Sequence, residues 1–278
     1  MHCCAAVALV GTTTLVGCDL PAGFHDYRVF GGLVQPTNVE FAPDGRVFVA
    51  EKRGVVKVFD NLDDPTPSTV ADLRTRVFNG WDRGLLGLGI APDFTTDPAV
   101  YVLYTLDKMP GGTIPAWGSP GQDVDNCPEP PGYTENGCVV MSRLSKLPLR
   151  ADGTWTGRET VLVEDWCQQF PSHTIGTVAF GPDGSVYAGS GDGASFHYTD
   201  YGQAGSPKNP CGDPPGGVGG TQVPATAEGG SLRAQDVRTL DDPTTAAGAI
   251  IRVDADTGAP MPDNPLIDSP NVGARRVV

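Results

Sequence analysis

The chain of 278 residues is long enough to bury a sizeable hydrophobic core, and its 37 Gly and 26 Pro favour many turns and argue against a helical bundle. The formal net charge of −14 repels phosphate backbones, so no nucleic acid partner is expected. Beyond residue 18, no stretch is long and apolar enough to span a bilayer.

The first 18 residues have the features of a processing signal. Residues 5–17 form an uncharged apolar run of the length found in signal peptides. The run ends in Leu15-Val16-Gly17-Cys18, which resembles a bacterial lipobox with Cys18 as the lipidated residue, although no Lys or Arg precedes it. A plain secretory signal is the alternative. We expect an exported domain over residues 19–278, in the periplasm, on the cell surface or outside the cell, with membrane contact only through a lipid anchor.

A repeated pattern organises the rest of the chain. Residues 39–49 (VEFAPDGRVFV) and 178–188 (VAFGPDGSVYA) alternate apolar residues on both sides of Pro-Asp-Gly, which is typical of a β-hairpin. A looser copy covers residues 88–94 and 100–104. Hairpin repeats spaced by about 40–50 residues indicate the blades of a β-propeller. Further strands, in the outer parts of blades, are expected at 54–59, 139–144 and 249–253.

Segments outside this repeat give weaker signals. Residues 69–78 are the one stretch expected to form a short helix. Two long Gly/Pro-rich loops are expected at 107–136 and 198–231. Loops of this length in a compact domain are usually functional or disordered, and we expect these two to shape substrate choice.

Four cysteines remain after the signal, and an even number in an exported chain indicates two disulfides. Three pairings are possible. Proximity in sequence favours Cys127 with Cys138, which leaves Cys167 with Cys211. The chain has no Cys-x-x-Cys pattern and no Cys/His cluster, so no zinc site is expected.

His173 and Asp192 flank the repeat at 178–188. If Pro182-Asp183-Gly184 is the tip of the hairpin, its two arms pair in antiparallel order. Two residues then lie opposite each other when their residue numbers sum to about 365. These two residues meet that condition at the open end of the hairpin. A histidine beside a carboxylate is the arrangement of a general base and the group that orients it. The alternative is a histidine that hydrogen-bonds a loop, beside an ordinary Gly-Asp-Gly turn.

The order of several motifs resembles the soluble PQQ-dependent sugar dehydrogenases, the glucose/sorbosone dehydrogenase family of six-bladed propellers. The motifs that carry the resemblance are Gln35-Pro-Thr37, Arg83-Gly-Leu-Leu-Gly87, Ser172-His173, Gly191-Asp-Gly193, and the strand at 248–253 followed by Met261-Pro-Asp-Asn-Pro265. Each is weak alone, but their order and spacing over residues 35–265 are fairly specific for the fold and less specific for the activity.

The resemblance implies an enzyme that oxidises an aldose-type sugar by hydride transfer to PQQ, helped by calcium and an external electron acceptor. His173 matches the family's general base, and Asp192 matches a carboxylate near it. Asp82 stands where many members have a cofactor-contacting Gln. Arg83 would contact a PQQ carboxylate or form a surface salt bridge. Ser172 stands where some members have Asp, which alters the surroundings of the base.

In the family, a second essential Arg, the calcium ligands and the last blades follow the segment at which this chain ends. The resemblance therefore implies an all-β, six-bladed propeller truncated to roughly its first half, with calcium ligands beyond residue 278. Such a fragment would not bind PQQ or turn over by itself. Two other functions remain open: a non-catalytic propeller that binds glycans or a protein partner, and a lactonase-type hydrolase, which would need carboxylates and Asn around the channel.

Overall fold

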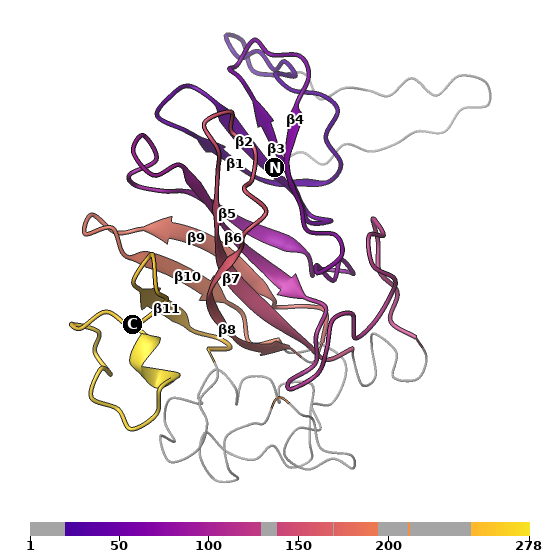
Figure 1. Cartoon of the computed structure of the whole chain (residues 1–278). Coiled ribbons are helices and arrows are strands. Elements are labelled where there is room, and N and C mark those ends of the chain that lie inside the picture. The colour runs from indigo at the N-terminus through magenta and orange to yellow at the C-terminus, as the bar shows by residue number, and fades with distance from the viewer. Residues whose placement is uncertain (1–19, 129–137, 169, 194–210, 212–245) are drawn as a thin grey trace.

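The computed structural model in Figure 1 describes residues 20–128, 138–168, 170–193, 211 and 246–278. The expected signal segment and Cys18 therefore lie outside the described residues, as does most of the expected loop at 198–231. The described residues form three antiparallel sheets and one short 3-10 helix, η4 (Ala274–Arg276). None of the helices in these ranges is long and apolar enough to cross a membrane.

Each sheet follows the chain as a meander. The first sheet contains β1 (Pro36–Phe41), β2 (Val47–Glu51), β3 (Val55–Phe59) and β4 (Ser68–Asp72). The second contains β5 (Leu85–Ile90), β6 (Ala99–Leu106), β7 (Val140–Pro148) and β8 (Thr160–Gln168). The third contains β9 (Ile175–Phe180), β10 (Val186–Ser190) and β11 (Ile250–Val253).

The three copies of the repeat form the hairpins β1–β2, β5–β6 and β9–β10, as predicted. The expected outer strands are present as β3, β7 and β11. The first strands of the sheets are neighbours, because β1 packs on β5 and β5 packs on β9. Each sheet is therefore a blade, and the three blades follow one another with the second between the other two (Figure 1).

The predicted helix at 69–78 is wrong. Its first part is β4, which pairs with β3 through Val55↔Asp72 and Val56↔Ala71. The β-branched Thr69 and Val70 suit a strand, and the available edge of β3 supplies hydrogen-bond partners that an isolated short helix lacks.

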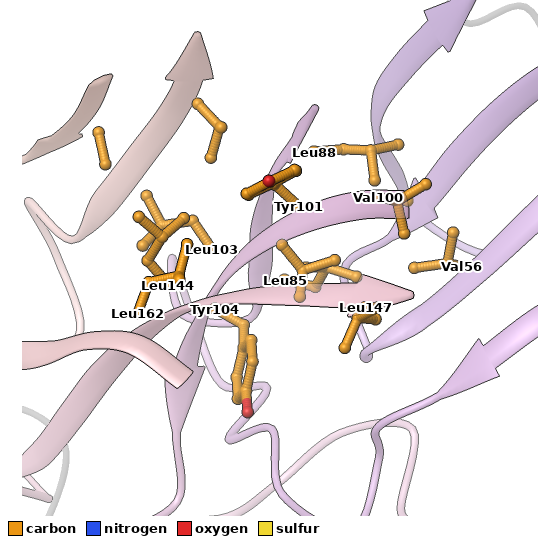
Figure 2. Close-up of a cluster of buried hydrophobic side chains, with 14 of the residues drawn as sticks. Val56, Leu85, Leu88, Val100, Tyr101, Leu103, Tyr104, Leu144, Leu147 and Leu162 are labelled. Atoms are coloured by element: carbon orange, nitrogen blue, oxygen red, sulfur yellow. The ribbon is translucent and has the colours of Figure 1, made fainter. Parts of the chain in front are cut away.

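The main hydrophobic core lies between the blades (Figure 2). All eight residues of β6 are buried, because the second blade is covered on both faces, and its sequence AVYVLYTL is nearly continuously apolar for that reason. Leu103, Leu144 and Leu162 lie together in Figure 2 and bring β6, β7 and β8 into contact with this core. Burial of each such side chain stabilises the fold by about 1.5–3 kcal/mol.

The second and third blades approach closely where β5 faces β9. A Cβ atom on Gly87 would lie 2.7 Å from the carbonyl oxygen of Gly176, so a larger residue would push the strands apart. The two disulfides are Cys127–Cys138 and Cys167–Cys211, with Cα–Cα distances of 5.8 Å and 5.2 Å, which confirms the expected pairing.

Candidate active site

The open end of the β9–β10 hairpin brings His173 and Asp192 together. The pairing runs from Val186↔Phe180 to Ser190↔Ile175, with a bulge before the last pair. Beyond the bulge, the Nδ1 atom of His173 lies 2.9 Å from an Oδ1 oxygen of Asp192. The contact expected from the hairpin register is confirmed.

The backbone around His173 is held in an uncommon conformation. His173 has a φ of 52°, in the left-handed region. The N–H of Gly193 donates to the carbonyl of His173 at 2.9 Å, and the N–H of Gly191 donates to the carbonyl of Thr174 at 2.7 Å. A Cβ on Gly191 would lie 2.3 Å from the carbonyl oxygen of His173. The Gly-Asp-Gly segment therefore closes around the histidine backbone, which an ordinary turn would not require.

The His173–Asp192 pair is placed for proton transfer. The side chains are 36% and 23% exposed, so the pair is reachable from solvent while part of each group is shielded. The carboxylate of Asp192 accepts the Nδ1–H of His173, which leaves Nε2 as the proton-accepting nitrogen of the neutral ring. The carboxylate also stabilises the imidazolium that forms when Nε2 takes a proton.

Asp82 lies beside this pair although it belongs to the second blade. Its backbone N–H donates to the carbonyl of Pro171 at 3.1 Å, and its own carbonyl accepts the hydroxyl of Thr174 at 3.0 Å. The residue is exposed. The structure therefore brings Asp82 to the same edge as His173, where its carboxylate can contact a ligand.

Arg83 follows Asp82 in sequence, but its side chain is not exposed at this edge. Its side chain is fully buried, and its guanidinium donates to the carbonyls of Cys138 and Gln168. It also lies over the ring of Phe78, 5.6 Å from the centroid. The expected contact with a cofactor carboxylate and the alternative surface salt bridge both require an accessible guanidinium. Arg83 instead ties the segment before β5 to Cys138, which precedes β7, and to Gln168 at the end of β8.

Lys52 is a residue that the sequence reasoning missed. It follows β2, is half-buried, and donates from Nζ to Oδ1 of Asn79 at 2.7 Å. Burial lowers the pKa of Lys52, and the nearby Asp82 carboxylate partly opposes that change. No motif marks Lys52; the available signal was its place directly after an inner hairpin, at the same end as His173.

A second missed residue is Gln168, at the end of β8. Its side chain is fully buried, and neither its amide oxygen nor its amide nitrogen has a hydrogen-bond partner within the described ranges. Its Cγ lies 3.7 Å from the position of a Cβ on Gly193. A buried amide beside the Asp192 loop is therefore available to a bound polar group or water. The parts of the chain that are described contain no group of three or more His, Cys, Asp or Glu side chains placed to hold a metal ion.

Comparison with known proteins agrees with this fold. The profile of the Glucose / Sorbosone dehydrogenase family matches residues 33–213. A glucose dehydrogenase-like oxidoreductase from Thermus thermophilus superposes with a TM-score of 0.55 at 22% identity, covering 90% of this chain and 52% of that one. The PQQ-bound aldose sugar dehydrogenase from Streptomyces coelicolor superposes with a TM-score of 0.51 at 18% identity, covering 87% and 51%.

One similar protein is named for an interaction and not for a reaction. The mouse Hedgehog-interacting protein is 30% identical over 173 residues, which are 60% of this chain and 22% of that protein. The chain thus spans about half the length of the solved structures above and a smaller share of this relative. The structural likenesses identify the fold as a β-propeller, of which the three blades are a part. With the family profile covering residues 33–213, the chain belongs to the glucose/sorbosone dehydrogenase family.

Proposed function

We propose that the protein is an exported sugar dehydrogenase that oxidises an aldose, with His173 as the general base and PQQ as the hydride acceptor. The observation that carries the proposal is the 2.9 Å contact between His173 and Asp192 at the open end of a blade hairpin. Membership of a sugar dehydrogenase family supports the oxidoreductase class and the sugar substrate. The two disulfides support folding in an oxidising compartment.

The residues at this edge fit a polar, anionic quinone. PQQ carries carboxylates and quinone oxygens, which require a cation and hydrogen-bond donors. Lys52, which is only half-buried, would supply the cation in place of the fully buried Arg83. Asp82 would repel a cofactor carboxylate, and its charge is offset by Lys52. When bound, PQQ supplies the acceptor for a hydride.

The residues of the chain would handle the proton. The Nε2 atom of His173 accepts the proton of the anomeric hydroxyl, whose O–H bond breaks. The hydrogen on C1 leaves with its electron pair, and the C–O bond becomes the carbonyl of a lactone. Asp192 keeps the ring in the tautomer that can accept this proton and stabilises the resulting imidazolium.

The test is turnover by the full-length protein. We would add PQQ and calcium and follow dye reduction with a panel of aldoses, comparing wild type, His173→Ala and His25→Ala. His25 is exposed in the N-terminal segment and serves as the matched control. We expect turnover that depends on PQQ, a loss of about 10³-fold in His173→Ala and none in His25→Ala. Equal activity in wild type and His173→Ala would exclude the proposed base.

A second candidate is a propeller that binds a protein partner without catalysis. It is favoured by the 30% identity over 173 residues with the Hedgehog-interacting protein, whose name describes an interaction and no reaction. Calorimetry with PQQ separates the two candidates. A folded full-length protein that binds no PQQ and reduces no dye would support the binding module.

A further inference from the structure

Three residues other than glycine have positive φ in the described part of the chain. They are Gln35, Trp81 and His173, with φ of 48°, 54° and 52°. Each precedes the innermost strand of a different blade, namely β1, β5 and β9. Residues other than glycine adopt this backbone conformation at a cost in free energy that the surrounding structure must offset. Such residues cluster at functional sites.

Hydrogen bonds join these three segments into one row, which we call the rim (Gln35, Lys52, Trp81–Asp82 and Pro171–Thr174). The N–H of Lys52 donates to the carbonyl of Gln35 at 2.9 Å, and the N–H of Leu85 donates to the carbonyl of Lys52 at 2.8 Å. The backbone bonds of Asp82 to Pro171 and Thr174 continue the row to the third blade. Trp81 is therefore fixed one residue from a direct contact with the His173 segment.

The side chain of Trp81 is 60% exposed, whereas Trp166 is fully buried in the core. Exposing a large aromatic ring forgoes the free energy that its burial would supply, and the left-handed backbone of Trp81 adds a further cost. Both costs fall on one residue at the edge that holds the His173–Asp192 pair. The indole is therefore accessible to a ligand that binds at this edge.

We propose that Trp81 is a specificity-determining residue whose indole packs against the apolar face of the sugar ring presented to His173. This inference rests on the proposed sugar substrate. The neighbouring Asp82 is exposed and acidic, and a neutral, hydroxyl-rich ring approaches it without charge repulsion. The electron-rich face of the indole attracts the polarised C–H groups of a pyranose, and the Asp82 carboxylate can accept hydrogen bonds from its hydroxyls.

The test measures sugar binding without turnover. We would titrate the full-length protein with D-glucose and D-xylose in the absence of PQQ and follow indole fluorescence and heat. The other tryptophans are held within the fold: Trp166 is buried, and the indole N–H groups of Trp117 and Trp155 donate to the carbonyls of Val139 and Arg158. Trp155→Phe is the matched control.

We expect Trp81→Ala to weaken sugar binding about tenfold and Trp81→Phe about twofold, because phenylalanine keeps an aromatic face. The sugar-dependent fluorescence change should vanish in Trp81→Phe and persist in Trp155→Phe. In turnover assays, Trp81→Ala should raise KM and leave kcat nearly unchanged, as expected for a contact made equally in the ground and transition states.

Several results would overturn this inference. They are an unchanged sugar Kd in a folded Trp81→Ala protein, a change confined to the Kd for PQQ, or no sugar binding by the wild type. The outcomes also separate the two proposals. If sugar binding depends on Trp81 but no turnover is seen, the proposed role of Trp81 stands and the proposed dehydrogenase activity is rejected. If the protein turns over sugar with a KM that does not change in Trp81→Ala, the dehydrogenase activity stands and the proposed role of Trp81 is rejected.

Discussion

The hairpins β1–β2 and β9–β10 have the same Pro-Asp-Gly turn and the same bulge near the open end, yet these ends differ in chemistry. In the register of the repeat, Val34 and Arg53 take the places of His173 and Asp192. Arg53 pairs with Glu51 at 2.8 Å, and Glu51, which is fully buried, accepts the N–H of Val34 at 2.9 Å.

The comparison shows that one backbone design supports two uses. In the first blade, the open end is closed by an ion pair whose buried Glu51 accepts the backbone N–H of Val34. In the third blade, the equivalent end leaves a His–Asp pair partly open to solvent. Bulges re-aim the side chains that follow them, so the residue types at these positions, and not the hairpin itself, decide the role of each end.

The largest effect should come from Asp192→Asn. Asparagine keeps the size of the side chain but can donate to Nδ1 of His173, which would favour the wrong tautomer for a base at Nε2. We expect kcat to fall about 10³-fold with little change in the free energy of unfolding. Steady-state kinetics and urea unfolding of the full-length protein would check this. A fully active variant would show that the His173–Asp192 pair is a structural contact only, like the ion pair of Glu51 in the first blade.

Glu51→Ala tests the other end of the comparison. The variant leaves the N–H of Val34 without its acceptor and removes the buried partner of Arg53, so the free energy of unfolding should drop by about 3 kcal/mol. Asp263→Ala removes an exposed partner of Arg252 and should cost less than about 1 kcal/mol. Similar losses in the two variants, measured by chemical denaturation, would contradict the structural role of Glu51.

Gly191→Ala sharpens the account of how the third blade holds its histidine. The new methyl group would collide with the carbonyl of His173 and displace the base, so kcat should fall about 10²-fold. Gly189→Ala is the matched control, because a Cβ there meets nothing within 4 Å. Activity that falls equally in both variants would point to the strand as a whole and away from this close approach.

The second blade extends the comparison, since Asp107 directly follows β6 at the same end of its hairpin. Burial raises the pKa of Asp107 to about 6, although the N–H groups of Ala116 and Trp117 donate to its carboxylate. A carboxyl whose pKa is higher in the folded state stabilises the protein below its ordinary pKa of 3.8, and this contribution is lost as the pH rises through about 6.

We therefore expect the free energy of unfolding of the wild type to fall by about 2 kcal/mol between about pH 4 and pH 8 because of Asp107. The Asp107→Asn variant should not show this fall. The asparagine oxygen can still accept both backbone N–H groups. Urea unfolding of the wild type and the variant at both pH values measures this difference. Parallel pH dependence in the two proteins would show that Asp107 is not the group responsible.

Much of the architecture could be predicted from the residues because β-hairpins are local. Period-two alternation around Pro-Asp-Gly defines each inner hairpin, and the same register arithmetic places His173 opposite Asp192. The disulfide pairing followed from sequence spacing in the same way. The failed helix at 69–78 shows the limit of local signals, since the edge of β3 decided that segment.

By itself, then, the sequence determined the hairpins, the propeller blades and the histidine–carboxylate contact, all of which depend on residues close along the chain. Only the tertiary structure decided which groups share the rim. Arg83 and Asp82 are adjacent in sequence. The guanidinium of Arg83 is buried against carbonyls of the second blade, whereas the backbone of Asp82 bonds to the third blade. Lys52 and Trp81 join His173 through contacts between blades, and packing between distant segments leaves no periodic trace in the sequence.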